Sequence, residues 1–132
     1  MHVDEIAKST LESIPGLSGR IFPVEALKNA KAPFVFYISE AETEEDALDG
    51  PTGLFTAEIE VHCVAASYGA LMGLCRSVRN KLRSLTGTTH GGTLIERAVV
   101  RVASPDLKEK EVNLFRRAYA LQLDYQEVNE NE

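Results

Sequence analysis

The alternation of apolar and polar residues is clearest over residues 53–85, where it predicts a strand followed by a helix. Between residues 55 and 63 every second side chain is apolar, which is the period of a strand with one buried face. Beyond this strand the apolar residues recur at spacings of three and four, as on an amphipathic helix. Ser67 stands at the change of period, where its hydroxyl is suited to cap the helix. We expect this unit to form the centre of the core, with the face of Ile59 and Val61 covered. The apolar stripe of the helix comprises Tyr68, Leu71, Cys75, Val78, Leu82 and Leu85.

The same periods predict the other elements of the chain. Residues 3–14 form a helical stripe that ends at Pro15-Gly16, and residues 20–24 form a short edge strand or an entry into the sheet. Residues 32–39 are apolar on both faces, which is typical of a central strand or of one covered by another subunit. Residues 94–103 and 113–125 alternate and suggest a hairpin.

These elements predict one domain over residues 1–132, with residues 126–132 as a frayed tail. The fold class is α+β. We expect a two-layer sandwich, in which one mainly antiparallel or mixed sheet of four to five strands carries two helices on one face. Residues 86–93 and 104–111 read as connecting loops because they are rich in Gly and Thr or in charge.

The most acidic segment is EAETEEDALD, residues 40–49, in which six of ten residues are Asp or Glu. Like charges in a run repel one another and prefer solvent, so we expect a mobile acidic loop over residues 40–53. The run lacks the alternation and central glycine of a calcium loop, which favours the solvated loop over a metal site. The acidic residues are Glu40, Glu42, Glu44, Glu45, Asp46 and Asp49.

Composition narrows the function classes. The chain has 132 residues, of which 44% are hydrophobic and 26% charged, within the ordinary globular range. A formal net charge of -6 argues against a protein whose main task is to grip DNA phosphates. The sequence shows neither an apolar run of membrane-spanning length nor a signal-peptide core, so we expect synthesis in the cytoplasm and no membrane partner. Cys63 and Cys75 lie on apolar faces and read as buried thiols rather than zinc ligands.

Candidate chemistry is sparse, and we predict no catalytic, cofactor-binding or metal residues. His62 and Glu60 share the polar side of a strand, and His90 lies in a Gly-Thr loop, but neither histidine has an evident catalytic partner. The basic flank of the second helix suits a solvated face, DNA or an acidic neighbour. A sheet with helices on one face leaves the other face open, so docking or self-assembly is the leading class. The candidate interface comprises Val35, Tyr37, Glu58, Glu60, His62, Arg76, Arg79, Arg83, Arg117 and Tyr119.

The motifs together have a familiar layout. APFVFYI is followed by an acidic variable loop closing in LDGPTG, by the strand EIEVHCVAASYG, and by the helix ALMGLCRSVRNKL. The strand RRAYALQLDY ends the pattern, and an early helix begins it. In these features the chain resembles the tail completion proteins of long-tailed double-stranded DNA phages, also called tail terminator or head–tail joining proteins. The resemblance runs from the first helix to the last strand and rests on patterns, not on catalytic signatures.

This resemblance implies a structural role in the virion. Members of that family form a homo-oligomeric ring, usually a hexamer, at the head-proximal end of the tail tube, and the subunit can be monomeric in isolation. The ring stops polymerisation of the tail tube protein and offers a surface to the head connector protein, while DNA only passes through the lumen. An acidic protein suits that lumen because it repels DNA, and the loop 40–49 lines the lumen or touches a neighbour. A heterologous interface closes the ring.

Other hypotheses about the function stay open. One is an adaptor or stopper on the head side of the same junction. Another is a small metabolite-binding or enzymatic domain that uses His62, Glu60 and His90, since fold alone does not fix function.

Overall fold

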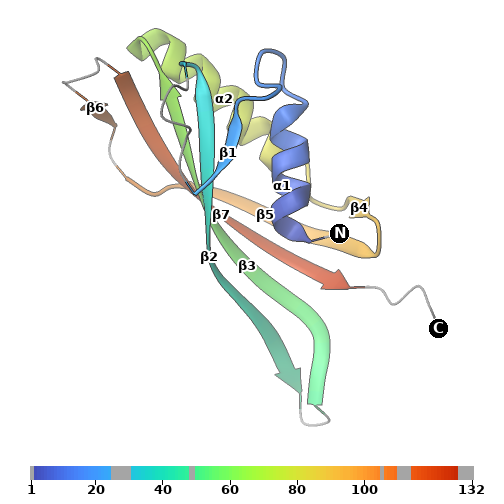
Figure 1. Ribbon diagram of the computed structural model, residues 1–132. Coiled ribbons are helices and arrows are strands. Elements are labelled where there is room, and N and C mark those ends of the chain that lie inside the picture. Colours follow the sequence, from blue (N-terminus) through green and yellow to red (C-terminus); the bar gives the residue numbers. More distant parts are fainter. Residues whose placement is uncertain (1, 25–30, 48–49, 105, 110–113, 128–132) are drawn as a thin grey trace.

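A computed structural model describes residues 2–24, 31–47, 50–104, 106–109 and 114–127 of the chain. These residues form two helices and seven strands (Figure 1). In chain order the elements are α1 (Val3–Glu12), β1 (Ile21–Pro23), β2 (Phe34–Ala47), β3 (Gly50–Ala65), α2 (Tyr68–Arg83), β4 (Thr89–His90), β5 (Thr93–Val102), β6 (Leu107–Glu109) and β7 (Leu114–Glu127).

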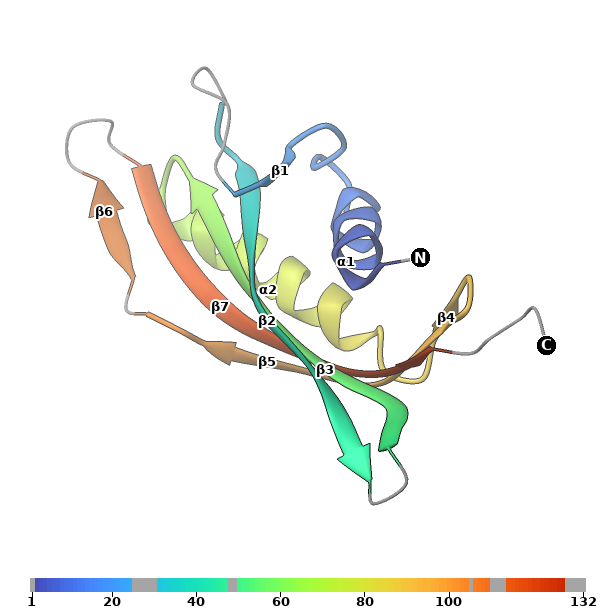
Figure 2. The ribbon, with the colours of Figure 1, turned by 60° about the horizontal axis from the view of Figure 1, so that its bottom comes forward.

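All strands of the described residues belong to one mixed sheet. Its order is β1-β2-β3-β7-β5-β4, and β6 pairs with the first residues of β7, outside this order. β1 and β2 run parallel, while every other described pair is antiparallel. Figure 2 shows that the sheet curls, so that β3, β7 and β5 curve beneath α2 like half of a barrel.

The core lies between this curled sheet and α2. Ile59, Val61 and Cys63 on β3 are at most 1% exposed, as the alternating pattern predicts. On α2 the residues Leu71, Val78 and Leu82 are fully buried against the sheet. Burying each such aliphatic side chain contributes about 1.5–3 kcal/mol, so this contact is the main source of stability. α1 packs on α2 and on β1 at the margin of this core.

The predicted helix cap is confirmed. The Ser67 hydroxyl accepts a hydrogen bond from the Ala70 backbone amide at 3.1 Å. The apolar stripe of α2 is likewise confirmed from Leu71 to Leu85. Tyr68 differs, because its side chain is 50% exposed at the first turn and turns away from the core.

The predicted fold class is wrong in the size and shape of its sheet. The sheet has seven strands rather than four or five, and it curls like half of a barrel instead of forming one layer of a two-layer sandwich. Two of the additional strands, β4 and β6, have two and three residues and lie in segments that the sequence presents as loops. Strands this short carry no readable alternation, which is why the periodic pattern missed them.

The acidic loop is also corrected. Residues 40–47 continue β2, and residues 50–53 begin β3, so the two strands form one long hairpin. Leu48 and the predicted loop residue Asp49 lie outside the described residues. The cross-strand ladder from Ala41 to Ala47 supplies the backbone hydrogen bonds that a charge argument does not foresee. At the other end of the chain, β7 extends to Glu127, beyond the start of the predicted frayed tail.

β5 carries a bulge that changes which residues face the core. The register with β7 shifts between Ile95 and Arg97. Ile95 is therefore fully buried, although simple alternation assigns the inward position to Leu94. Beyond the bulge, Val102 lies across from the buried Tyr119 but is itself 60% exposed at the end of the strand. A bulge adds one residue to one strand and reverses the faces on either side of it.

Candidate interaction surfaces

The far half of the β2–β3 hairpin projects from the body of the molecule. We call residues 40–47 and 50–54 the arm; in Figures 1 and 2 it extends away from both helices. The Glu44 carboxylate accepts a hydrogen bond from the Gly53 amide at 3.2 Å, and the Tyr125 hydroxyl donates to Glu42. Phe55 stacks on Tyr125 at the base of the arm, with ring centroids 5.2 Å apart. A few polar and aromatic contacts therefore hold the arm, rather than a covering helix.

One side of the arm has no strand partner. β1 pairs with β2 only at Val35, Phe36 and Tyr37. Among the described residues no strand lies beyond β2 from Ile38 to Ala47, so the backbone groups that point away from β3 form an open edge there. Such edges are templates for pairing with another chain. The side chains on this edge include Glu40, Glu42 and Glu44; the predicted loop residues Glu45 and Asp46 belong to the same strand.

The arginines of α2 share one flank. Ser77 and Lys81 face the α1 side of the helix, where they line grooves together with Ile14 and Pro15. Helical geometry places Arg76, Arg79 and Arg83 on the opposite flank, toward β5 and β6. Arg76 and Arg83 are exposed and Arg79 is half-buried.

The outer face of the sheet, the face away from α2, carries His62, Glu60 and Glu58. The His62 ring stacks on Phe36 with centroids 4.4 Å apart and planes at 5°, and its Nε2 bonds the Glu60 carboxylate. A hydrogen bond with Glu40 lowers the pKa of Glu60, and the same bond raises the pKa of Glu40. Glu58 is exposed. The predicted polar face therefore exists, and its histidine is held between an aromatic ring and a carboxylate.

Arg117 lies on the helix-covered face instead and ties β6 to α2. Its guanidinium donates two hydrogen bonds to the Asp106 carboxylate, at 2.6 and 2.9 Å, and the Tyr68 hydroxyl donates to the same carboxylate at 2.9 Å. Hydrogen bonds from Arg117 and then from Tyr68 lower the pKa of Asp106 despite partial desolvation. The Asp106 partnership raises the pKa of the Arg117 guanidinium. Nothing in the sequence singles out Asp106, because a charged turn gives no signal for a partner eleven residues away.

Three predicted interface residues are in the core, and their placement on an open face is wrong. Val35 is fully buried, Tyr37 is 8% exposed and Tyr119 is 3% exposed. Val35 and Tyr37 pair with Cys63 and Val61 of β3, whose side chains lie beneath α2. Burial raises the pKa of both tyrosines. Their neighbours Phe36 and Ile38 reach the outer face instead, and both are half-buried.

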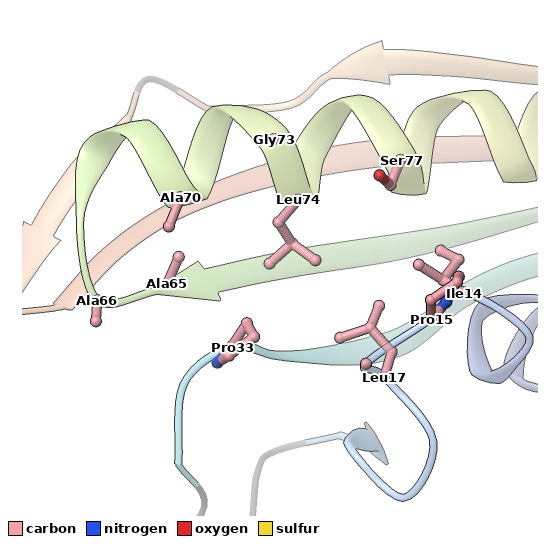
Figure 3. A pocket seen from close by; sticks show the side chains of 11 residues that line it. Ile14, Pro15, Leu17, Pro33, Ala65, Ala66, Ala70, Gly73, Leu74 and Ser77 are labelled. Atoms are coloured by element: carbon pink, nitrogen blue, oxygen red, sulfur yellow. The ribbon is translucent and has the colours of Figure 1, made fainter.

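An apolar groove of about 500 Å³ lies beside the first half of α2 (Figure 3). Small residues of the helix, including Ala70 and Gly73, form one wall, and Pro33 and Leu17 form the opposite one. In Figure 3 the Leu74 side chain points from α2 into the groove. None of the described residues that line the groove is charged, so these residues offer shape and mainly apolar contact.

Cys63 and Cys75 are free, buried thiols, as predicted. A hydrogen bond with Cys75, together with burial, raises the pKa of the Cys63 thiol. Within the described parts of the chain no three His, Cys, Asp or Glu side chains converge on a point where a metal ion would bind. None of the described helices is long and apolar enough to cross a membrane.

Comparisons with known proteins give a likeness in fold only. No protein-family model and no curated protein matches the sequence. Among solved structures, the fold is similar to that of a chain in a structure titled as the virion of a native gene transfer agent particle. The TM-score is 0.55 at 11% sequence identity, and the match covers 91% of each chain. The likeness therefore extends over the whole fold rather than over one shared motif.

Proposed function

We propose that this protein is a structural subunit of a virion, and that it acts as the tail completion or terminator protein of a long-tailed phage. The observation that carries the proposal is the likeness in fold to a chain of a gene transfer agent virion, over 91% of both chains. The motifs of the sequence add the specific role, because they resemble those of tail completion proteins.

In this role the subunits form a ring on the head-proximal end of the tail tube. The ring covers the surface on which the next tube subunit would add, and it presents a new surface to the head connector. The action is steric and thermodynamic, so no side chain needs to make or break a bond. An open strand edge beside a projecting arm supports such a role, since both features gain partners only in an assembly.

The acidic character of the chain supports a DNA-conducting ring. The formal net charge is -6, and Glu40, Glu42 and Glu44 lie along one edge of the arm. Carboxylates that face a lumen repel the phosphate backbone and allow DNA to slide through. We therefore place the arm at the lumen or at a neighbouring subunit.

The test uses purified chain, tail tubes of the same phage and DNA-filled heads. We expect electron microscopy with a labelled chain to show density at one end of each tube. When further tube protein is added, the length of the tubes should not increase. Labelling of filled heads in place of tubes would assign the protein to the head side of the junction. Binding to neither structure would contradict the proposed function.

A further inference from the structure

We propose that the acidic edge of one subunit docks against a basic side of the next subunit. The acidic edge is the side of β2 that faces away from β3, with Glu40, Glu42 and Glu44. The basic side lies at the opposite end of the sheet and is formed by β5 and α2. This inference rests on the proposed ring and names the surfaces that close it. The basic side comprises Arg97 and Arg101 of β5 and Arg76, Arg79 and Arg83 of α2.

Both ends of the sheet have open backbone. On β5, β4 covers only Thr93 and Leu94. The loop after α2 then satisfies the amides of Ile95 and Ala98, at 2.8 and 3.0 Å. Among the described residues no strand pairs with the outer side of β5 from Val99 to Val102. An open segment therefore stands at each end of one sheet, on β2 and on β5.

The directions of these strands allow them to pair. β2, β3, β7 and β5 alternate in direction across the sheet, because each neighbouring pair is antiparallel. β5 therefore runs opposite to β2. A second copy placed so that the sheet continues brings its β2 antiparallel to β5 of the first, which permits a regular ladder.

The charges select this contact over the alternatives. Two acidic β2 edges repel one another, and so do two basic β5 sides. Only the contact between the acidic edge of one copy and the basic side of another is attractive. The contact is therefore heterologous and propagates from copy to copy. Such a contact closes into a ring where the rotation allows it.

Acidic and basic groups also match on each face of the sheet. Glu42 and Glu44 lie across from Ala57 and Phe55, which places these carboxylates on the helix-covered side, where the α2 arginines also lie. Glu40 reaches the outer face, where it lies close to Glu60. Arg97 and Arg101 pair across from Asp124 and Ala120 and belong to that same outer face.

These arginines are available for a partner. None of the five forms an ion pair or a hydrogen bond with the side chain of another described residue, in contrast to Arg117, which is bound to Asp106. Arg76, Arg83, Arg97 and Arg101 are exposed. Arg117 is thus already paired, while the five arginines along this side have no such partner among the described residues.

The test reverses charge on one side at a time. One variant carries Glu40→Lys on the outer face and Glu44→Lys on the helix-covered face, and a second carries Arg97→Glu on the outer face and Arg76→Glu on the helix-covered face. We expect each variant alone to self-associate roughly tenfold or more weakly than the natural chain, measured by native mass spectrometry and sedimentation. Self-association of the natural chain should also weaken as NaCl rises from about 0.05 to about 0.5 M.

Mixing the two variants gives the decisive result. A lysine-bearing β2 edge then meets a glutamate-bearing β5 side, and the natural edges of the two variants also match. We therefore expect a 1:1 mixture to recover assembly with alternating subunits, and the chain carrying all four changes to assemble by itself. Controls with the same change in charge are Glu5→Lys with Glu12→Lys, and Lys8→Glu with Lys31→Glu, which leave both sides intact. Circular dichroism checks that every variant is folded.

Two outcomes would overturn this inference. One is a natural chain that remains monomeric at millimolar concentration and low salt. The other is a set of variants that assemble as the natural chain does, or that fail to recover on mixing. Capping of tail tubes is a separate measurement. Tubes that are capped by variants with unchanged assembly would refute this interface and leave the proposed function standing.

Discussion

The two halves of β3 have the same covalent backbone and different physical roles. From Ala57 to Ala65 the inward side chains of the strand are buried beneath α2, and Ile59 is 1% exposed. From Gly50 to Phe55 the strand lies beyond the helix and pairs with β2 on the arm. The first region is held by apolar burial, the second by a ladder and a few polar contacts. Stability therefore resides in the body, and association is proposed for the arm.

The largest effect on stability should come from truncating a buried side chain in the body. Ile59→Ala removes buried methyl groups beneath α2 and leaves a cavity, so we expect a loss of about 2–5 kcal/mol in the free energy of unfolding. Leu54→Ala, at the base of the arm, removes a half-buried side chain and should cost about 1 kcal/mol or less. Urea denaturation measures both. Equal losses at the two positions would remove the distinction between body and arm.

The next effect concerns the backbone of the arm. Gly53 has φ +78°, in the left-handed region, where the register of β2 and β3 shifts. No atom lies within 4 Å of a Cβ built at this position, so the cost of Gly53→Ala is conformational and should be about 1–2 kcal/mol. Gly69→Ala is the control, since that helical site is equally open and alanine favours a helix by about 1 kcal/mol. Thermal unfolding should show opposite signs for the two variants, and the same sign would contradict this reasoning.

A smaller effect depends on pH. Asp106 has a lowered pKa in the folded chain because Arg117 and Tyr68 donate hydrogen bonds to its carboxylate. Its contribution is complete above the unfolded pKa of about 3.9 and is lost as the pH falls through the lower, folded pKa. Asp106→Asn should therefore cost about 1 kcal/mol at neutral pH, since the ion pair is partly exposed.

The gap in unfolding free energy between the natural chain and Asp106→Asn should narrow below a pH of about 4. Glu58→Gln is the control, because the exposed Glu58 carboxylate bonds to no described side chain. A gap for Asp106→Asn that stays constant from pH 7 to pH 3 would show that the charge of this carboxylate does not act through Arg117.

The sequence predicted the body well for a physical reason. Strict alternation before Ser67 and helical spacing after it leave only one way to bury both stripes, so the β3–α2 unit and its covered face follow from pattern alone. Capping by Ser67 follows from its place at the change of period.

The remaining features depend on partners far apart in the chain. A strand that is apolar on both faces, such as residues 34–38, does not reveal which face is inside. Val35 and Tyr37 were therefore assigned to the wrong face. Acidic residues in the arm suggest a loop until the ladder with β3 is known. The Asp106–Arg117 pair likewise forms only after β6 folds back on β7.

Amide hydrogen exchange on the isolated and the assembled chain tests the division of roles most directly, because one measurement reports on both regions. In the isolated chain we expect fast exchange along residues 38–47 and slow exchange along residues 57–65 and in α2. On assembly, alone or on tail tubes, residues 38–47 and 99–102 should become protected while the body stays unchanged. Assembly without any gain of protection in these two segments would contradict the account.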